Sequence, residues 1–454
     1  MKKILIAVAA MVVAGAVMAQ NHEQIHIYRN DKNFKTHKAN EVTAVKFDGN
    51  AADGAENMTV TTADGKDHVY PMSAVDSCVV RTTGIPDIYV NLIDYPEWTE
   101  LQGAKDDVRA ATLYMNGNGM YDDLEEQTVE FRGRGNSTWK MDKKPYRFKM
   151  AKKKSVCGLP KAKTFALLAN NIDCTLMRNS IAMWIANYLE IPYSNHMVPV
   201  NVYLNGIHKG QYVMTEKIGI GGGSVDIDET TGMLFELDTN YDEDFKFRYN
   251  WDEKTVAKSI PVMVKDPDLA ELAEDPEVPG ITDAAEYLAK WKADFAVMAD
   301  AVIKRAPSES LSDVLDIDAA ANYFLVFCLA GNHEIHHPKS VYIHKKSLDP
   351  AEVYHFGPVW DFDWAFTFNG KEGAPANEPL IVIDGKASGY TFFKHIMQNK
   401  EFRAAFKAKF DAFVEVGYPK LKSFMAEYAT LIEPSAKENG LLWPTRRDQG
   451  SRYN

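Results

Sequence analysis

Residues 129–139 read Val-Glu-Phe-Arg-Gly-Arg-Gly-Asn-Ser-Thr-Trp, and residues 143–149 continue with Lys-Lys-Pro-Tyr-Arg-Phe-Lys. The pattern predicts a strand that runs into a glycine-containing turn, and then a second strand over residues 145–150. Basic side chains and the backbone N–H groups of such a turn suit a phosphate group. The alternative is a solvated charged face. The candidate phosphate contacts here are Arg132, Arg134, Lys144 and Arg147.

A second informative stretch, residues 358–364, reads Pro-Val-Trp-Asp-Phe-Asp-Trp and directly follows a predicted strand. Aromatic residues flank Asp361 and Asp363, and buried carboxylates are costly unless they are paired or hold a cation. Since Mg²⁺ and Mn²⁺ favour carboxylate oxygens, one interpretation is a divalent-metal site. The alternative is a loop whose carboxylates cap a helix or pair with arginine.

The chain around these stretches carries signals for both helices and strands. Asn205-Gly206 lies between two strand-like runs, 198–203 and 210–216, and predicts a hairpin. Apolar periodicity predicts helices over residues 175–189, 283–303 and 317–331, and an Asp- and Glu-rich lid or insertion is expected over residues 241–279. These signals together predict an α+β fold.

The first residues resemble a secretory signal peptide, with Lys2-Lys3 followed by an apolar run and small residues before Gln20. We therefore expect a signal peptide at 1–19, a small β-rich module at 20–84, a large domain at 85–435 and a C-terminal tail at 436–454. The predicted location is exported: periplasmic, cell-surface or secreted. No later apolar run is long enough to cross a bilayer, so no transmembrane segment is expected in the mature chain.

Composition excludes some functions. The net charge of −12 and the pI near 5.5 argue against nucleic acid as a partner, because phosphate backbones require a positive surface. The four cysteines lack any C-x-x-C spacing, which favours free thiols, although a bridge between Cys157 and Cys174 stays open.

Several segments resemble, in their residues and in their order along the chain, the spore-coat-protein-H (CotH) family of atypical protein kinases. The resemblance covers about residues 87–435 and leaves out the N-terminal module. It includes the two stretches quoted above together with Gly-Leu-Pro-Lys-Ala-Lys (158–163), Leu-Leu-Ala-Asn (167–170), Leu-Met-Arg-Asn (176–179), Gly-Gln-Tyr (210–212), Glu-Lys (216–217), Asn-His-Glu (332–334) and Pro-Lys-Ser (338–340).

The resemblance implies an atypical protein-kinase-like fold that transfers the γ-phosphoryl group of ATP to Ser or Thr of an exported protein substrate, with Mg²⁺ or Mn²⁺. It implies that Lys144 or a neighbouring Lys or Arg contacts the ATP phosphates with support from Glu216, and that Arg178 contributes to the same site. It further implies that Asp361 and Asp363 hold the metal and that Lys144 and Asp361 face one cleft. Glu334 would be the catalytic base in place of the family's usual Asp, and Ser340 would lie near the metal.

Two other functions remain open. A domain without the usual Asp base can be a catalytically inactive binding or cell-surface scaffold. Residues 333–337 also spell the zinc-protease pattern His-Glu-x-x-His, which requires both histidines inside one α-helix. Gly331 and Pro338 flank the pattern closely and argue against such a helix.

Overall fold

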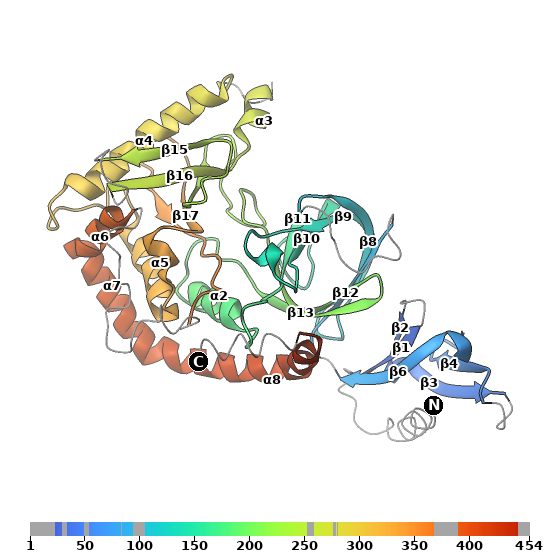
Figure 1. Cartoon of the computed structure of the whole chain (residues 1–454). Coiled ribbons are helices and arrows are strands. Elements are labelled where there is room, and N and C mark those ends of the chain that lie inside the picture. Colours follow the sequence, from blue (N-terminus) through green and yellow to red (C-terminus); the bar gives the residue numbers. More distant parts are fainter. Residues whose placement is uncertain are drawn as a thin grey trace.

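The computed structural model describes residues 23–29, 34–49, 54–82, 84–93, 105–251, 258–275, 278, 280–366 and 389–443. The predicted signal peptide lies outside these residues, and so do residues 444–454 of the predicted tail. Helices and sheets both occur, which confirms the α+β class. Figure 1 shows a small N-terminal β module, a barrel and a larger part with most of the helices.

The predicted β-rich module consists of two three-stranded antiparallel sheets. Its small core contains Ile25, Ile27, Met58 and Val60. One sheet has the order β2 (Phe34–Lys38), β1 (Glu23–Arg29), β6 (Val75–Thr82), and the other β3 (Val42–Asp48), β4 (Asn57–Thr62), β5 (Asp67–Pro71).

A closed seven-stranded barrel follows, which the sequence did not predict. Alternate side chains such as Phe131, Phe148 and Phe165 fill its interior. Asn205 and Gly206 have φ of 47° and 78°, as the predicted two-residue hairpin turn requires. The barrel order is β10 (Tyr146–Lys154), β11 (Ala162–Leu168), β13 (Ile207–Glu216), β12 (Val198–Leu204), β7 (Asp87–Leu92), β8 (Arg109–Asn116), β9 (Leu124–Gly133).

The larger part contains a five-stranded sheet of order β15 (Lys246–Asn250), β16 (Ser259–Asp266), β14 (Met233–Leu237), β17 (Val341–Lys345), β18 (His355–Phe356). Residues 241–279, expected as a lid or insertion, instead supply β15, β16 and α3 (Leu269–Glu274). In the described part of this segment, apolar residues such as Phe247 and Val262 are buried in the core.

The predicted helices are confirmed. α2 (Arg178–Tyr188) precedes the β12–β13 hairpin, and α4 (Ala284–Lys304) and α5 (Ile317–Ala330) begin after the capping residues Asp283 and Asp316. α6 (Tyr390–Gln398), α7 (Lys400–Ala412) and the π-helical turn η6 (Phe413–Gly417) follow in sequence.

The last helix, α8 (Tyr418–Leu442), connects the helical part to the barrel (Figure 1). Asn439 on α8 accepts a hydrogen bond of 2.8 Å from the buried Lys143 ammonium, and Trp443 donates to the backbone oxygen of Lys209 at 3.1 Å. The helix therefore continues past residue 435, where the predicted tail begins. It packs on the barrel strand β13.

None of the helices in the described part of the chain combines the length and the apolar composition that crossing a bilayer requires. All four cysteines are free thiols, and Cys157 contacts the sulfur of Met115.

Candidate functional site

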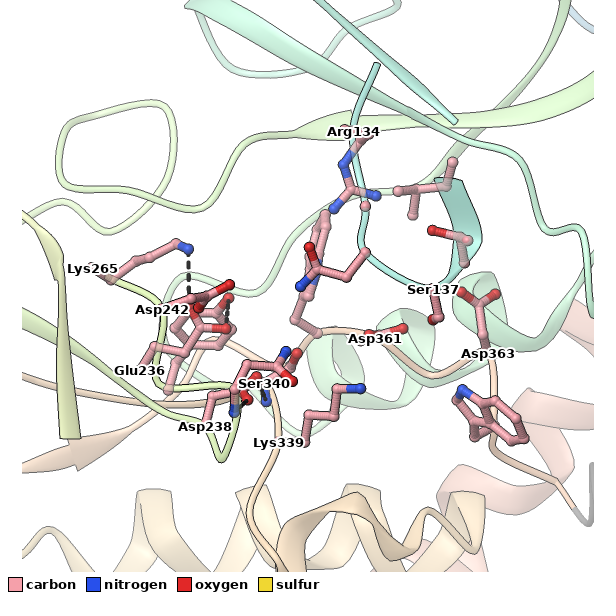
Figure 2. Close-up of a pocket in the computed structure, with 18 of the residues that line it drawn as sticks. Arg134, Ser137, Glu236, Asp238, Asp242, Lys265, Lys339, Ser340, Asp361 and Asp363 are labelled. Carbon is pink, nitrogen blue, oxygen red and sulfur yellow. Dashed lines mark hydrogen bonds and ion pairs between the residues drawn. The ribbon is translucent and has the colours of Figure 1, made fainter. Parts of the chain in front are cut away.

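A polar cavity of about 420 Å³ lies where the barrel meets the larger part. The glycine-containing turn after β9 forms one wall, and the loop after β18 forms another. In Figure 2, Arg134 reaches in from the turn, while Asp361 and Asp363 come from the loop and Lys339 extends in from the segment before β17. Segments more than 200 residues apart in sequence thus share one cavity.

The two glycines explain the shape of the turn. A Cβ on Gly133 would meet the Trp139 ring at 2.4 Å, so only glycine lets this ring pack against the end of β9. Gly135 has φ of 80°, in the left-handed region that favours glycine. The backbone then enters a short 3₁₀ turn, η3 (Thr138–Lys140), and exposes Ser137 to the cavity.

Helix α2 holds the acidic loop in place. The Asn179 side chain accepts a hydrogen bond from the backbone N–H of Phe362 and donates one to Asp363 Oδ1, both at 2.9 Å. Arg178 donates to the backbone oxygen of Asp363 at 3.2 Å, and Asn332 donates to that of Asp361 at 3.3 Å. Asp361 itself has φ of 62°, a strained backbone angle for a non-glycine residue that these contacts maintain.

The electrostatics of the pair suit a positive ligand. Burial and the neighbouring carboxylate of Asp361 raise the pKa of Asp363 to about 7, and burial raises the pKa of Asp361 as well. Burial lowers the pKa of Arg134, while its attraction to both aspartates opposes that shift. Two ionised carboxylates so placed repel each other, and a bound cation would relieve their repulsion.

The wall opposite the barrel carries four more ionisable groups, Glu236, Asp238, Glu243 and Lys265. Lys265 pairs with Glu236 at 2.8 Å and with Glu243 at 3.0 Å. Asp238 accepts hydrogen bonds from the backbone N–H groups of Asn240 and Ser340, at 2.6 and 3.1 Å. Burial nevertheless raises the pKa of Asp238 to about 6.

Glu334 lies close to the acidic loop. Its pKa is raised well above the usual range, first by burial and then by the charge of Asp361, while Lys339 lowers it. Its Oε2 is buried and has no hydrogen-bond partner among the described residues. A carboxylate oxygen in that state is available to accept a proton or to contact a cation.

Several predicted site residues converge on this cavity: Arg132, Arg134, Ser340, Asp361 and Asp363 line it. Arg147 lines an adjoining cavity of about 180 Å³ that shares Arg132, Arg134 and Trp360 with the first.

Four predicted residues, Lys144, Arg178, Glu216 and Glu334, are not among the residues that line either cavity. Glu334 lies next to the first cavity, close enough to Asp361 for their charges to interact. Lys144 donates to the backbone oxygen of Trp139 at 2.7 Å and lies over that residue's ring. Glu216, expected to support Lys144, instead accepts hydrogen bonds from the ring and the backbone N–H of His196, at 2.7 and 3.0 Å. Arg178 donates a hydrogen bond to the backbone oxygen of Asp363 in the acidic loop. The basic stretch therefore faces Asp361 through Arg134 and not through Lys144.

The sequence analysis missed several residues that line the site. Asn179 had a signal, because it belongs to the quoted segment 176–179. Asp238 directly follows β14, and Lys265 lies near the end of β16. Only the pairing of these two strands in the five-stranded sheet brings both residues to the cavity. Trp360 carried a signal too, since it flanks Asp361, and the Arg134 guanidinium now lies 5.4 Å from the centre of its ring.

No group of three or more His, Cys, Asp or Glu side chains is arranged to hold a metal ion in the part of the chain that the structure describes. The donor set at the acidic loop is the pair Asp361 and Asp363. A pair fits Mg²⁺ or Mn²⁺, because Mg²⁺ is usually held by one or two carboxylates while water and substrate phosphates complete its coordination. The raised pKa values of both aspartates and the unpartnered oxygen of Glu334 agree with that fit.

The zinc-protease pattern does not have the required local structure. Residues His333–His336 form a 3₁₀ turn, η5, and the α-helix α5 has already ended at Ala330 with Gly331 in the left-handed region. An α-helix is needed to bring positions 333 and 337 to one face. The backbone therefore argues against zinc proteolysis.

No curated protein matches this sequence. The family model described as "CotH kinase protein" matches residues 130–454, which include the basic turn, the acidic loop and α8. That match spans most of the chain, so this protein belongs to the CotH kinase family.

Proposed function

We propose that this protein is an atypical Ser/Thr protein kinase that acts on exported proteins, using ATP with Mg²⁺ or Mn²⁺. The observation that carries the proposal is the shared cavity: Arg134 and the acidic pair Asp361 and Asp363, more than 200 residues apart in sequence, line the same space. Phosphoryl transfer depends mainly on positioned phosphates and neutralised charge, which this arrangement offers.

Each group has a proposed role. ATP would supply the γ-phosphoryl group, and a divalent cation held by Asp361 and Asp363 would neutralise phosphate charge. Arg134 and the N–H groups of the turn at Gly135 would orient the phosphates, with Arg132 beside them. Lys339 would balance the remaining charge on the far side.

Glu334 is the proposed base. The acceptor hydroxyl would lose its proton to Glu334 while its oxygen bonds to the γ-phosphorus, and the bond from that phosphorus to the β,γ-bridging oxygen would break to leave ADP. Export, proposed from the leader at residues 1–19, would place this reaction outside the cytoplasm.

The first experiment is a thermal-shift titration of the purified protein with ATP, in the presence and absence of Mg²⁺ or Mn²⁺. We expect ATP to stabilise the protein only with the cation, and Asp361→Ala to remove this effect. Transfer of labelled phosphate to a Ser/Thr-rich peptide then tests turnover. Cation-dependent binding without transfer would favour the alternative, a catalytically inactive scaffold.

A further inference from the structure

The second cavity, of about 180 Å³, differs from the first in its charge. A single acidic side chain, Asp106, is among its described lining residues, and the basic side chains come from both sides of the cleft. They are Lys105, Arg132, Arg134, Arg147, Lys217 and Lys265.

Four of these cations already have partners. Arg132 pairs with Asp106 at 2.6 Å, Lys265 pairs with Glu236 and Glu243, and Lys105 donates to Asn136 at 2.8 Å. The Arg134 guanidinium lies over the Trp360 ring and is attracted by the charges of Asp361 and Asp363.

Arg147 and Lys217 have neither an ion pair nor a hydrogen bond within the described part of the chain. Burial and the nearby Arg132 and Arg134 guanidinium groups lower the pKa of Arg147, opposed by Asp106 and Glu130. Loss of hydration, Arg147 and Lys265 lower the pKa of Lys217, opposed by Asp266 and Glu243. Arg147 is half-buried and Lys217 is exposed, and neither is paired directly with the nearby carboxylates of the described residues. Together with the other basic side chains of the lining they give the cavity a net positive charge that favours an anion.

The ligand chemistry follows from this lining. A nucleobase carries no negative charge and would leave the repulsion among these cations in place. A phosphate monoester carries close to two negative charges and three acceptor oxygens, which guanidinium and ammonium groups bind well. Because both cavities are lined by Arg132 and Arg134, a phosphate in the second would lie beside the cavity proposed for the ATP phosphates.

We propose that the second cavity binds a phosphoserine or phosphothreonine already present in the acceptor protein, so that the kinase adds its next phosphate to a neighbouring hydroxyl. This proposal rests on the proposed kinase function and specifies its substrate class: primed, phosphorylated Ser/Thr-rich segments. Each transfer then creates a new phosphoserine, which serves as the anchor for the following one.

The test compares two synthetic peptides that differ only in one phosphoserine a few residues from the acceptor serine. With the full protein, we expect a KM for the phosphopeptide about tenfold lower than for the plain peptide, since charge-assisted hydrogen bonds are the strong ones. Arg147→Gln and Lys217→Gln should each reduce this ratio to about one to two. Lys149→Gln is the matched control, because Lys149 lies on the same face of β10, is exposed and lies outside the lining.

Equal KM values for the two peptides with the unmodified protein would overturn the proposal. It would also be overturned if Arg147→Gln raised the KM for ATP about tenfold and left the peptide ratio unchanged, because the cavity would then belong to the nucleotide. Fluorescence anisotropy of the labelled peptides separates this proposal from the kinase function. A protein that transfers no phosphate but binds the phosphopeptide about tenfold more tightly, in an Arg147-dependent manner, would contradict the kinase and retain the anion site.

Discussion

Asn179 donates a hydrogen bond of 2.9 Å to Asp363 Oδ1, so the first turn of α2 fixes the second carboxylate of the acidic loop. The oxygen of the same amide accepts from the backbone N–H of Phe362, also at 2.9 Å. One buried side chain therefore sets both the position of the loop and the rotamer of Asp363. Residues that orient metal ligands in this way influence cation affinity without being the main ligands.

We expect Asn179→Ala to raise the Mg²⁺ or Mn²⁺ concentration needed for half-maximal ATP binding by about 10- to 100-fold, as loss of such orienting partners does elsewhere. A cation titration at saturating ATP, read by thermal shift, measures this. Asn187→Ala is the control on the same helix, because its side chain donates only to the backbone oxygens of Met183 and Asn195. An unchanged cation requirement in Asn179→Ala would show that Asp363 is positioned by other contacts.

The acidic pair also predicts how stability depends on pH. Asp363 has a pKa of about 7 in the folded protein against 3.8 as its ordinary value. The folded state thus binds this proton more tightly than the unfolded state, so stability falls as pH rises from about 4 to 7 and stays low above. After allowing for screening by water in the cavity, we expect Asp363→Asn to stabilise the cation-free protein at pH 8 by about 2 kcal/mol.

Thermal unfolding in EDTA at pH 8 and pH 5 measures this effect. The substitution should raise the midpoint at pH 8 and have little effect at pH 5, where the native Asp363 is already protonated. Added Mg²⁺ should stabilise the native protein and not the variant. A variant that is less stable than the native protein at pH 8 would contradict a repulsive pair.

The sequence predicted the convergence of the site better than its details. The family resemblance implied that the basic stretch and the acidic pair face one cleft with Lys144 opposite Asp361, whereas in the structure Arg134 and not Lys144 lines the cavity with Asp361 and Asp363. The barrel was not predicted, because its closure depends on the parallel pairing of β7 with β12, for example Asp87 with Asn201. No local periodicity reports a contact between residues that far apart in sequence.

The sequence also could not show how the neighbouring side chains of Lys143 and Lys144 are oriented. Lys143 and Lys144 lie between η3 and β10, where no strand alternation determines which side chain points inward. In the structure Lys143 is fully buried beneath α8, and Lys144 folds back on Trp139. The role of Glu216 was implied by the family resemblance, and its partner His196 comes from a loop that sequence reasoning had not singled out.

This adjacent pair of lysines yields a clear prediction. The Lys143 ammonium donates to Asn439 Oδ1 and to the backbone oxygen of Gln211, and it lies 4.5 Å from the centre of the Tyr212 ring. Lys143→Met removes the ammonium donor from two buried oxygen atoms, so we expect the free energy of unfolding to fall by about 2–4 kcal/mol. Denaturant unfolding measures the loss.

Lys144→Met is the matched comparison. Its side chain is half-buried and makes one hydrogen bond, to Trp139, so the expected loss is about 1 kcal/mol. We also expect its KM for ATP to stay within about twofold of the native value, since Lys144 does not line the cavity. A tenfold rise in that KM would show that Lys144 does contact the ATP phosphates, which would require the turn to rearrange when ATP binds.

Glu334 provides the sharpest test of catalysis, because its Oε2 is buried without a hydrogen-bond partner among the described residues and faces the charge of Asp361. If it removes the acceptor proton, Glu334→Gln should lower kcat by about 10²- to 10⁴-fold, the usual contribution of a general base. Glu334→Asp, which keeps a carboxylate on a shorter side chain, should retain activity to within about tenfold of the native rate.

The pH profile then separates a base from a merely structural carboxylate. A base must be ionised to act, and burial together with Asp361 raises the pKa of Glu334, so kcat/KM should rise with pH along the acidic limb. Lys339 and a bound cation oppose that rise in pKa and should move the limb to lower pH. The limb should disappear in Glu334→Gln and return in Glu334→Asp. A Gln variant that keeps both its rate and its acidic limb would mean that another group, or solvent, takes the proton.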